Sequence, residues 1–175
     1  MRYPQLYKLF FLISFFSNQS FAQETRYFLF RHAEKDTSSP GSPMMMANPP
    51  LNEKGKARAL KLVDLLAHEV IDTIFSTPYL RTQQTVQPLA QAKNRIIEWY
   101  DPQKLDEFAA KLQSAIYKNK CIVIVGHSNT TPALVNLLLQ EKKYASLPDS
   151  VYNQYWIVTK KKNNELVVQQ RSFDE

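Results

Sequence analysis

The chain has 175 residues and a formal net charge of +6, and 44% of its residues are hydrophobic. This length fits one domain with a sizeable core. The mild positive charge suits anionic ligands, but the basic residues show no stripe or motif of a nucleic-acid-binding protein. Cys121 is the only cysteine, which excludes a disulfide within the chain.

The first 22 residues have the three parts of a secretory signal peptide. Arg2 and Lys8 make the start positive, residues 9–16 form an apolar core, and small residues precede a cleavage point after Ala22. The core is shorter than the roughly 20 apolar residues that a spanning helix needs. We therefore expect a signal peptide over residues 1–22 and one exported domain over residues 23–175, periplasmic or extracellular, without stable membrane insertion after cleavage. The alternative is an uncleaved anchor or a buried first helix.

Short apolar runs alternate with amphipathic stretches along the rest of the chain. The runs predict strands over residues 27–30, 72–76, 96–100, 121–125, 152–159 and 165–170. The stretches between them predict helices that start at Asn52, Thr77, Asp101 and Thr131, each as an N-cap and the last three followed by proline. This alternation predicts a three-layer α/β/α sandwich with a mostly parallel sheet and an antiparallel C-terminal hairpin.

Residues 36–50 form a long loop rich in serine and proline, which is a candidate lid over a binding site. The sequence pattern predicts no catalytic role for Cys121 or His68. Cys121 opens an apolar run and is expected in the core. His68 lies on the polar side of the first predicted helix and is expected at the surface.

Three predicted strands end in residues that suit phosphate chemistry. The first ends at Arg31-His32, the second leads to Arg81, and the central one ends at His127-Ser128. Ligands of open α/β sheets bind outside the carboxyl ends of the strands, so these side chains should meet at one edge. The arginine fork matches phosphate oxygens, and a neutral histidine can act as a nucleophile.

Four segments resemble, in order and spacing, the motifs of the histidine phosphatase superfamily, whose fold is also called phosphoglycerate mutase-like. They are FRHAE at residues 30–34, PLNEKGKARA at 50–59, FSTPYLRTQQT at 75–85 and VGHSNT at 125–130. The resemblance implies that His32 is the nucleophile and forms a phosphohistidine that water then hydrolyses. Arg31, Arg81 and His127 would surround the phosphoryl group, and Ser128 would help to bind it. It implies no metal and no cofactor.

Two departures from the family pattern concern the residues after His32. Ala33 replaces the usual glycine, and alanine disfavours a positive φ. The proton donor for the leaving group is open, and Glu34 is the preferred acid or site-shaping carboxylate. Other carboxylates that could serve are Glu98, Asp101, Asp106 and Glu107. A leaving group that needs no protonation would require none of them.

The sequence thus predicts an exported, metal-independent phosphatase that acts on a phosphorylated small molecule or a phosphoprotein. The chain lacks the helical insertions of larger family members, so its site should be open and covered mainly by residues 36–50. Three alternatives remain: a phosphoglycerate mutase-like phosphotransferase, a non-catalytic module that binds phosphorylated ligands, and a phosphatase of phosphohistidine proteins.

Overall fold

The computed structural model describes residues 24–38 and 47–173. The predicted signal peptide and the centre of the 36–50 loop lie outside these residues. The described strands form one sheet in the order β3-β2-β4-β1-β5-β6. Their bounds are β1 (Thr25–Arg31), β2 (Thr73–Ser76), β3 (Ile97–Trp99), β4 (Cys121–Gly126), β5 (Gln154–Lys160) and β6 (Leu166–Ser172).

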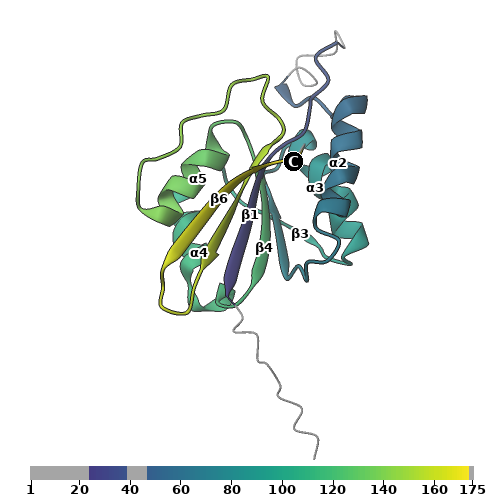
Figure 1. Ribbon diagram of the computed structural model, residues 1–175. Coiled ribbons are helices and arrows are strands. Elements are labelled where there is room, and N and C mark those ends of the chain that lie inside the picture. Colours follow the sequence, from purple (N-terminus) through teal and green to yellow (C-terminus); the bar gives the residue numbers. More distant parts are fainter. Residues whose placement is uncertain (1–23, 39–46, 174–175) are drawn as a thin grey trace, which may run out of the picture.

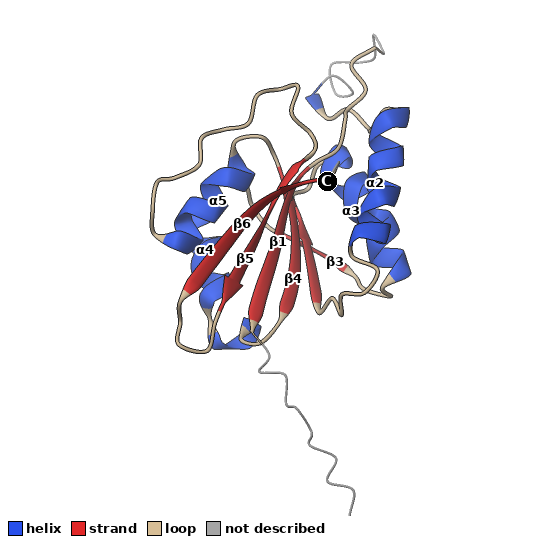
Figure 2. Cartoon of the chain, viewed as in Figure 1, coloured by secondary structure: helices blue, strands red, loops and turns tan. Residues whose placement is uncertain are grey.

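Strands β1, β4, β2 and β3 are parallel neighbours. On the other side of β1, β5 pairs antiparallel with β1, and β6 pairs antiparallel with β5. The helices are α2 (Glu53–Leu65), α3 (Leu80–Ala92), α4 (Leu105–Gln113) and α5 (Thr130–Leu139), with a short 3₁₀ turn, η1 (Ala115–Tyr117). Figures 1 and 2 show α2 and α3 on one face of the sheet and α4 and α5 on the other. The predicted three-layer sandwich with a C-terminal hairpin is confirmed.

The order of the strands explains why the helices divide between the two faces. From β1 to β3 the chain moves outward in one direction, and from β3 to β4 it moves back. Parallel crossovers are right-handed, so a reversal of direction transfers the next helix to the opposite face. Two apolar clusters result. One lies between the sheet and α4 and α5, and the other between the sheet and α2 and α3. Strand β4 is buried along its whole length between them.

The predicted helix starts are right at one position and wrong at three. Asn52 caps α2, and its Oδ1 accepts a hydrogen bond from the backbone N–H of Gly55. The other helices begin later or earlier than the Thr-Pro and Asp-Pro pairs suggest, at Leu80, Leu105 and Thr130. The hydroxyls of Thr77 and Thr131 hydrogen-bond elsewhere in the fold. At these two positions, a threonine before proline makes a tertiary hydrogen bond instead of capping a helix.

Two structural assignments made from the sequence are confirmed. Cys121 is buried, and burial raises the pKa of its thiol to about 11, so it stays protonated and inert at neutral pH. His68 is exposed at the end of the first helical segment. Within residues 24–38 and 47–173, no helix is both long enough and apolar enough to cross a bilayer.

Candidate active site

The predicted site residues lie at one edge of the sheet, where β1, β2 and β4 end. Arg31 pairs with Gly126 in the register of β1 and β4, and Ser76 of β2 pairs with Val125 of β4. The residues that follow these pairs, His32, Thr77 and His127, are therefore neighbours across three adjacent strands. Parallel strands deliver their carboxyl ends to the same edge, and this brings the expected residues together.

His32 is held as a neutral imidazole with a defined tautomer. Its Nδ1 lies 2.8 Å from the carbonyl oxygen of Ala33, so Nδ1 carries the proton and Nε2 keeps its lone pair. Burial, opposed by this hydrogen bond and reinforced by the charges of Arg81 and Arg31, lowers the pKa of His32 to about 3. The ring is only 4% exposed. A buried, unprotonated Nε2 is what a histidine nucleophile requires.

His127 faces His32, with the ring centroids 5.5 Å apart. Its Nδ1 lies 3.4 Å from Nη2 of Arg81, which can only donate, so Nδ1 accepts. Its Nε2 then carries the proton and donates it to Oγ1 of Thr77 over 3.0 Å. Burial, together with the charges of Arg81 and Arg31, lowers the pKa of His127 to about 4. Both site histidines are therefore neutral at physiological pH.

Thr77 is the first member of a buried pair of hydroxyls behind His127. Its Oγ1 lies 2.9 Å from Oγ1 of Thr82, and either oxygen can donate to the other. The hydroxyl of Thr82 also reaches the carbonyl oxygens of Thr77 and Tyr79. Both threonines are fully buried. The hydroxyl hydrogens of this pair can turn, so Thr77 can accept a hydrogen bond from Nε2 or donate one to it without any charge entering the core.

Gly126 is required just before His127, because the chain there passes close to three side chains. A Cβ on Gly126 would lie 2.7 Å from the hydroxyl of Tyr100 and 2.9 Å from that of Thr131. The hydroxyl of Thr131 donates to the carbonyl oxygen of Phe30 in β1. The start of α5 is thereby fixed against the two central strands, and His127 is fixed with it.

Arg81 and Arg31 supply the positive charge of the site. The guanidinium of Arg81 packs over the ring of Tyr79, 4.6 Å from its centroid. Nη1 of Arg31 donates to the carbonyl oxygens of Pro148 and Val151 at 2.8 and 2.7 Å, and the guanidinium lies 4.0 Å from the centroid of the Tyr152 ring. Nε of Arg31 is buried and has no partner in the described part of the chain.

The contacts of Arg31 show that the segment before β5, at residues 148–152, covers the site. The ring of Tyr152 also meets the ring of His32 edge-on, with centroids 6.0 Å apart. The expected cover, residues 36–50, is described only at its two ends, so its role as a lid stays a prediction. No sequence pattern predicts that Tyr152 lies near His32, because Tyr152 follows a long stretch without a motif.

Glu34 is held in an ion pair directly beside the site. Nε and Nη2 of Arg58 donate to its two carboxylate oxygens at 3.0 and 2.7 Å, and Nζ of Lys54 lies 3.6 Å away. Burial raises the pKa of Glu34, but the hydrogen bonds and charges of Arg58 and Lys54 outweigh it, and the net shift is downward. A proton donor needs a raised pKa. The ion pair and the lowered pKa favour the site-shaping role of Glu34, and its role as general acid stays a prediction.

Ala33 occupies the position where the family motif has a glycine. It is fully buried, and it is not among the described residues with positive φ. Its N–H donates to Oγ1 of Thr85 in α3 over 2.9 Å, while its carbonyl accepts from His32. Ala33 therefore joins His32 to α3, and the turn needs no glycine conformation.

A hollow of about 270 Å³ lies against Arg81 and His127. Its other lining residues are neutral: Tyr79, Pro102, Gln103, Asn129 and Thr130. Within the described part of the chain, no carboxylate lines it. Ser128 is absent from this lining, and its carbonyl accepts a hydrogen bond from the N–H of Leu147. The phosphate-binding role of its hydroxyl stays a prediction.

The other carboxylates that the sequence suggested as acids have other partners or lie elsewhere. Oδ1 of Asp101 accepts from the N–H of Gln103, and Glu98 lies 3.8 Å from Nζ of Lys111. Asp106 lines a separate hollow between α4 and α5, and Glu107 pairs with Lys104 at the surface. Among residues 24–38 and 47–173, no three His, Cys, Asp or Glu side chains gather so as to hold a metal ion.

Comparison with known proteins agrees with this geometry. The family model of the histidine phosphatase superfamily (branch 1) matches residues 27–113, which include His32 and Arg81. The chain belongs to the histidine phosphatase superfamily. Among curated proteins of this superfamily, phosphoserine phosphatase 1 of Hydrogenobacter thermophilus is 39% identical over 66 residues, which are 38% of this chain and 31% of that protein.

Solved structures of histidine phosphatases share the fold. The protein histidine phosphatase SixA complexed with tungstate superposes with a TM-score of 0.64 at 17% identity, covering 85% of this chain and 97% of that one. The phosphoserine phosphatase of Entamoeba histolytica in complex with 3-phosphoglyceric acid gives a TM-score of 0.62 at 14% identity, covering 84% and 96%. At these identities the likeness establishes the fold alone.

Proposed function

We propose that this protein is a metal-independent phosphatase that hydrolyses phosphomonoesters through a phosphohistidine on His32. The observation that carries the proposal is the state of His32. Its Nδ1 proton is fixed on the Ala33 carbonyl, its pKa lies at about 3, and two arginines and a second neutral histidine surround it. These are the features of a nucleophile beside a binding site for phosphoryl oxygens.

The reaction would proceed in two displacements at phosphorus. Nε2 of His32 forms a bond to phosphorus as the bond to the ester oxygen breaks, and the leaving group departs with the electron pair. A water molecule then attacks the phosphohistidine, the N–P bond breaks, and the electron pair returns to Nε2. In both steps Arg31 and Arg81 stabilise charge on the equatorial oxygens, and His127 donates a hydrogen bond through Nδ1 once its proton has moved there from Nε2.

A panel of phosphomonoesters tests the proposal. The wild type should release phosphate from p-nitrophenyl phosphate, and His32→Asn should lower the rate by at least about a thousandfold. The matched control is His68→Asn, which removes an exposed histidine and should leave the rate unchanged. Phosphate transfer between hydroxyls without release would instead favour the mutase. Binding of phosphate esters without turnover would favour the non-catalytic module.

A second candidate is hydrolysis of phosphohistidine or another phosphoramidate. The observation in its favour is the absence of a carboxylate from the described lining of the hollow beside His127, together with the lowered pKa of Glu34. Such a leaving nitrogen needs less help from an acid than an alkoxide does. The structural neighbour SixA is a protein histidine phosphatase, which agrees with this candidate. Comparison of phosphoimidazole with phenyl phosphate decides between the two substrate classes.

We further propose that the protein is exported. The support is the sequence of residues 1–22, with Arg2 and Lys8 before an apolar core and small residues before position 23. N-terminal sequencing of the protein recovered from a periplasmic fraction should begin at Gln23. Recovery of the intact chain from the cytoplasm would refute export and would favour a phosphohistidine protein as the substrate.

A further inference from the structure

A polar pocket near the start of β1 lies far from the proposed active site. It has a volume of about 460 Å³ and takes its lining from three segments: the start of β1, residues 112–119, and the β5–β6 turn. Thr25 lines this pocket, whereas Arg31 at the other end of β1 lies in the active site. A seven-residue strand is roughly 20 Å long, so the two sites are separate.

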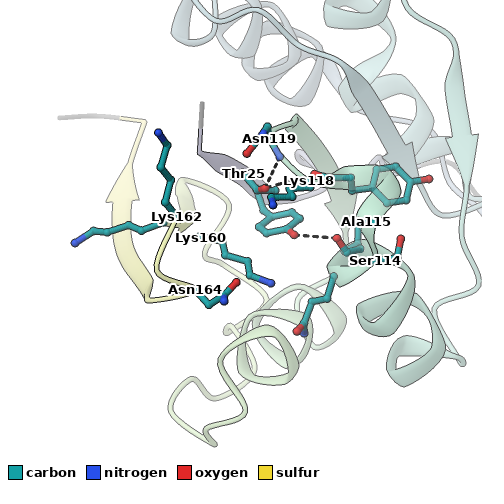
Figure 3. Close-up of a pocket in the computed structure, with 13 residues that line it drawn as sticks. Thr25, Ser114, Ala115, Lys118, Asn119, Lys160, Lys162 and Asn164 are labelled. Atoms are coloured by element: carbon teal, nitrogen blue, oxygen red, sulfur yellow. Dashed lines mark hydrogen bonds between the residues drawn. The ribbon is translucent and has the colours of Figure 1, made fainter. Parts of the chain in front are cut away.

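Lysines approach this pocket from two opposite walls. Figure 3 shows Lys118 and Asn119 on one wall and Lys160 and Asn164 on the other, with Ser114 and Ala115 on a third side. Lys161 and Lys162 belong to the same turn as Lys160. Within the described residues, no Asp or Glu lines the pocket, and the structure shows no carboxylate partner for Lys118 or Lys160. Lys161 alone pairs, with Glu165 at 3.2 Å.

A buried hydroxyl beside the pocket is left without a partner. The carbonyls of Leu112 and Ala115 already accept hydrogen bonds, from the hydroxyl of Tyr27 and the N–H of Lys118. By contrast, the hydroxyl of Ser114 is buried and has no partner in the described part of the chain. A free hydroxyl donor beside ammonium groups, in a lining without a described carboxylate, favours an anion.

We propose that this pocket binds a small phosphate-bearing anion, with Lys118 and Lys160 as its charged ligands. The pocket volume falls within the range of roughly 300–1,000 Å³ that small-molecule sites occupy. Lysine binds phosphate as a point charge and needs no bidentate geometry. The phosphate group can come from a soluble monoester or from a phospholipid headgroup. The site goes beyond the proposed phosphatase function and does not depend on it.

The test is an NMR titration of the ¹⁵N-labelled His32→Asn protein, which should not hydrolyse a phosphomonoester probe. The probes are glycerol 3-phosphate, a soluble monoester, and glycerophosphoglycerol, the deacylated headgroup of phosphatidylglycerol. The amide signals of Ala115 and Asn164 report on this pocket, and the amide of Thr130 reports on the active site. We expect glycerol 3-phosphate to shift Ala115 and Asn164. A shift with glycerophosphoglycerol alone would also support the site and would identify a lipid headgroup as its source.

Substitutions separate this pocket from the active site. Lys160→Gln should weaken binding reported by Ala115 about fivefold, the expected effect of one lysine, and leave the Thr130 titration unchanged. Lys61→Gln, an exposed lysine on α2, is the matched control and should change neither. Arg81→Gln should affect Thr130 only. The proposal is overturned if neither probe shifts Ala115 and Asn164, or if Lys160→Gln and Lys61→Gln behave alike.

Discussion

Replacement of Thr77 by valine tests how the fold controls His127. Valine has nearly the same shape as threonine but removes the hydroxyl that receives the Nε2 proton over 3.0 Å. In the free protein, His127 accepts from Arg81 at Nδ1. To donate from Nδ1 to a phosphoryl oxygen while neutral, it must lose its Nε2 proton and accept from Thr77 instead. The proton itself exchanges with water, and Thr77 accommodates either tautomer because its hydroxyl can accept from Nε2 or donate to it, whereas valine can do neither.

The expected loss follows from one buried hydrogen bond to the imidazole. Such a bond contributes about 1–2 kcal/mol when its loss leaves a buried group unpaired, which corresponds to a fivefold to thirtyfold fall in kcat/KM. Thr77→Ser retains the hydroxyl and should recover most of the rate. Both variants should bind product phosphate and unfold cooperatively, which confirms that the site is intact.

The assay is release of p-nitrophenol from p-nitrophenyl phosphate across pH 4–9, beside ¹⁵N spectra of the imidazole of His127. Thr77→Val should lower kcat more than it raises KM, and it should shift the spectrum toward a mixture of tautomers. A kcat/KM of Thr77→Val within twofold of the wild-type value, with an unchanged spectrum, would refute the role of the Thr77 hydroxyl in the change of tautomer. Loss of activity in Thr77→Ser as well would assign the effect to packing.

Further predictions concern neighbouring residues and pH. Glu34→Gln should lower the rates on phenyl phosphate and p-nitrophenyl phosphate by the same factor, because Glu34 positions the site through Arg58; a selective loss on phenyl phosphate would restore it as the general acid. Gly55→Ala should destabilise the fold by about 3 kcal/mol in urea unfolding, since its Cβ would lie 2.2 Å from the Glu34 carbonyl oxygen, whereas Lys61→Ala should change stability by less than about 0.5 kcal/mol. The pKa of His32 falls from 6.5 to about 3 on folding, so the unfolded chain binds an extra proton below pH 6.5. Stability should therefore decline as pH falls from 6.5 toward 3, and His32→Asn should reduce that slope; equal slopes would contradict the burial of a neutral histidine.

The sequence predicted the fold because its local patterns and its tertiary arrangement agree. Apolar runs marked all six described strands, and the burial of β4 on both faces follows from its continuous apolar sequence. The convergence of Arg31, His32, Arg81 and His127 was also predictable, since parallel strands end at a common edge. These residues lie at strand ends or close to them.

The sequence could not predict contacts made between distant segments. Thr77 before a proline is typical of a helix cap, but its hydroxyl binds His127, 50 residues away. Glu34 next to the nucleophile suggested an acid, but Arg58 from α2 pairs with it. The cover over Arg31 comes from Pro148, Val151 and Tyr152, which no motif connects to the site. In each case a partner far along the chain decides the role.

Trapping of the phosphorylated protein tests the central claim most directly. The protein is mixed with ³²P-labelled phenyl phosphate for milliseconds and quenched in base, where phosphohistidine is stable. The account predicts label that is lost in acid, located on His32 by peptide mapping, absent from His32→Asn and retained in His68→Asn. Release of phosphate by the wild type without any base-stable label, or label that persists in His32→Asn, would contradict a nucleophilic His32.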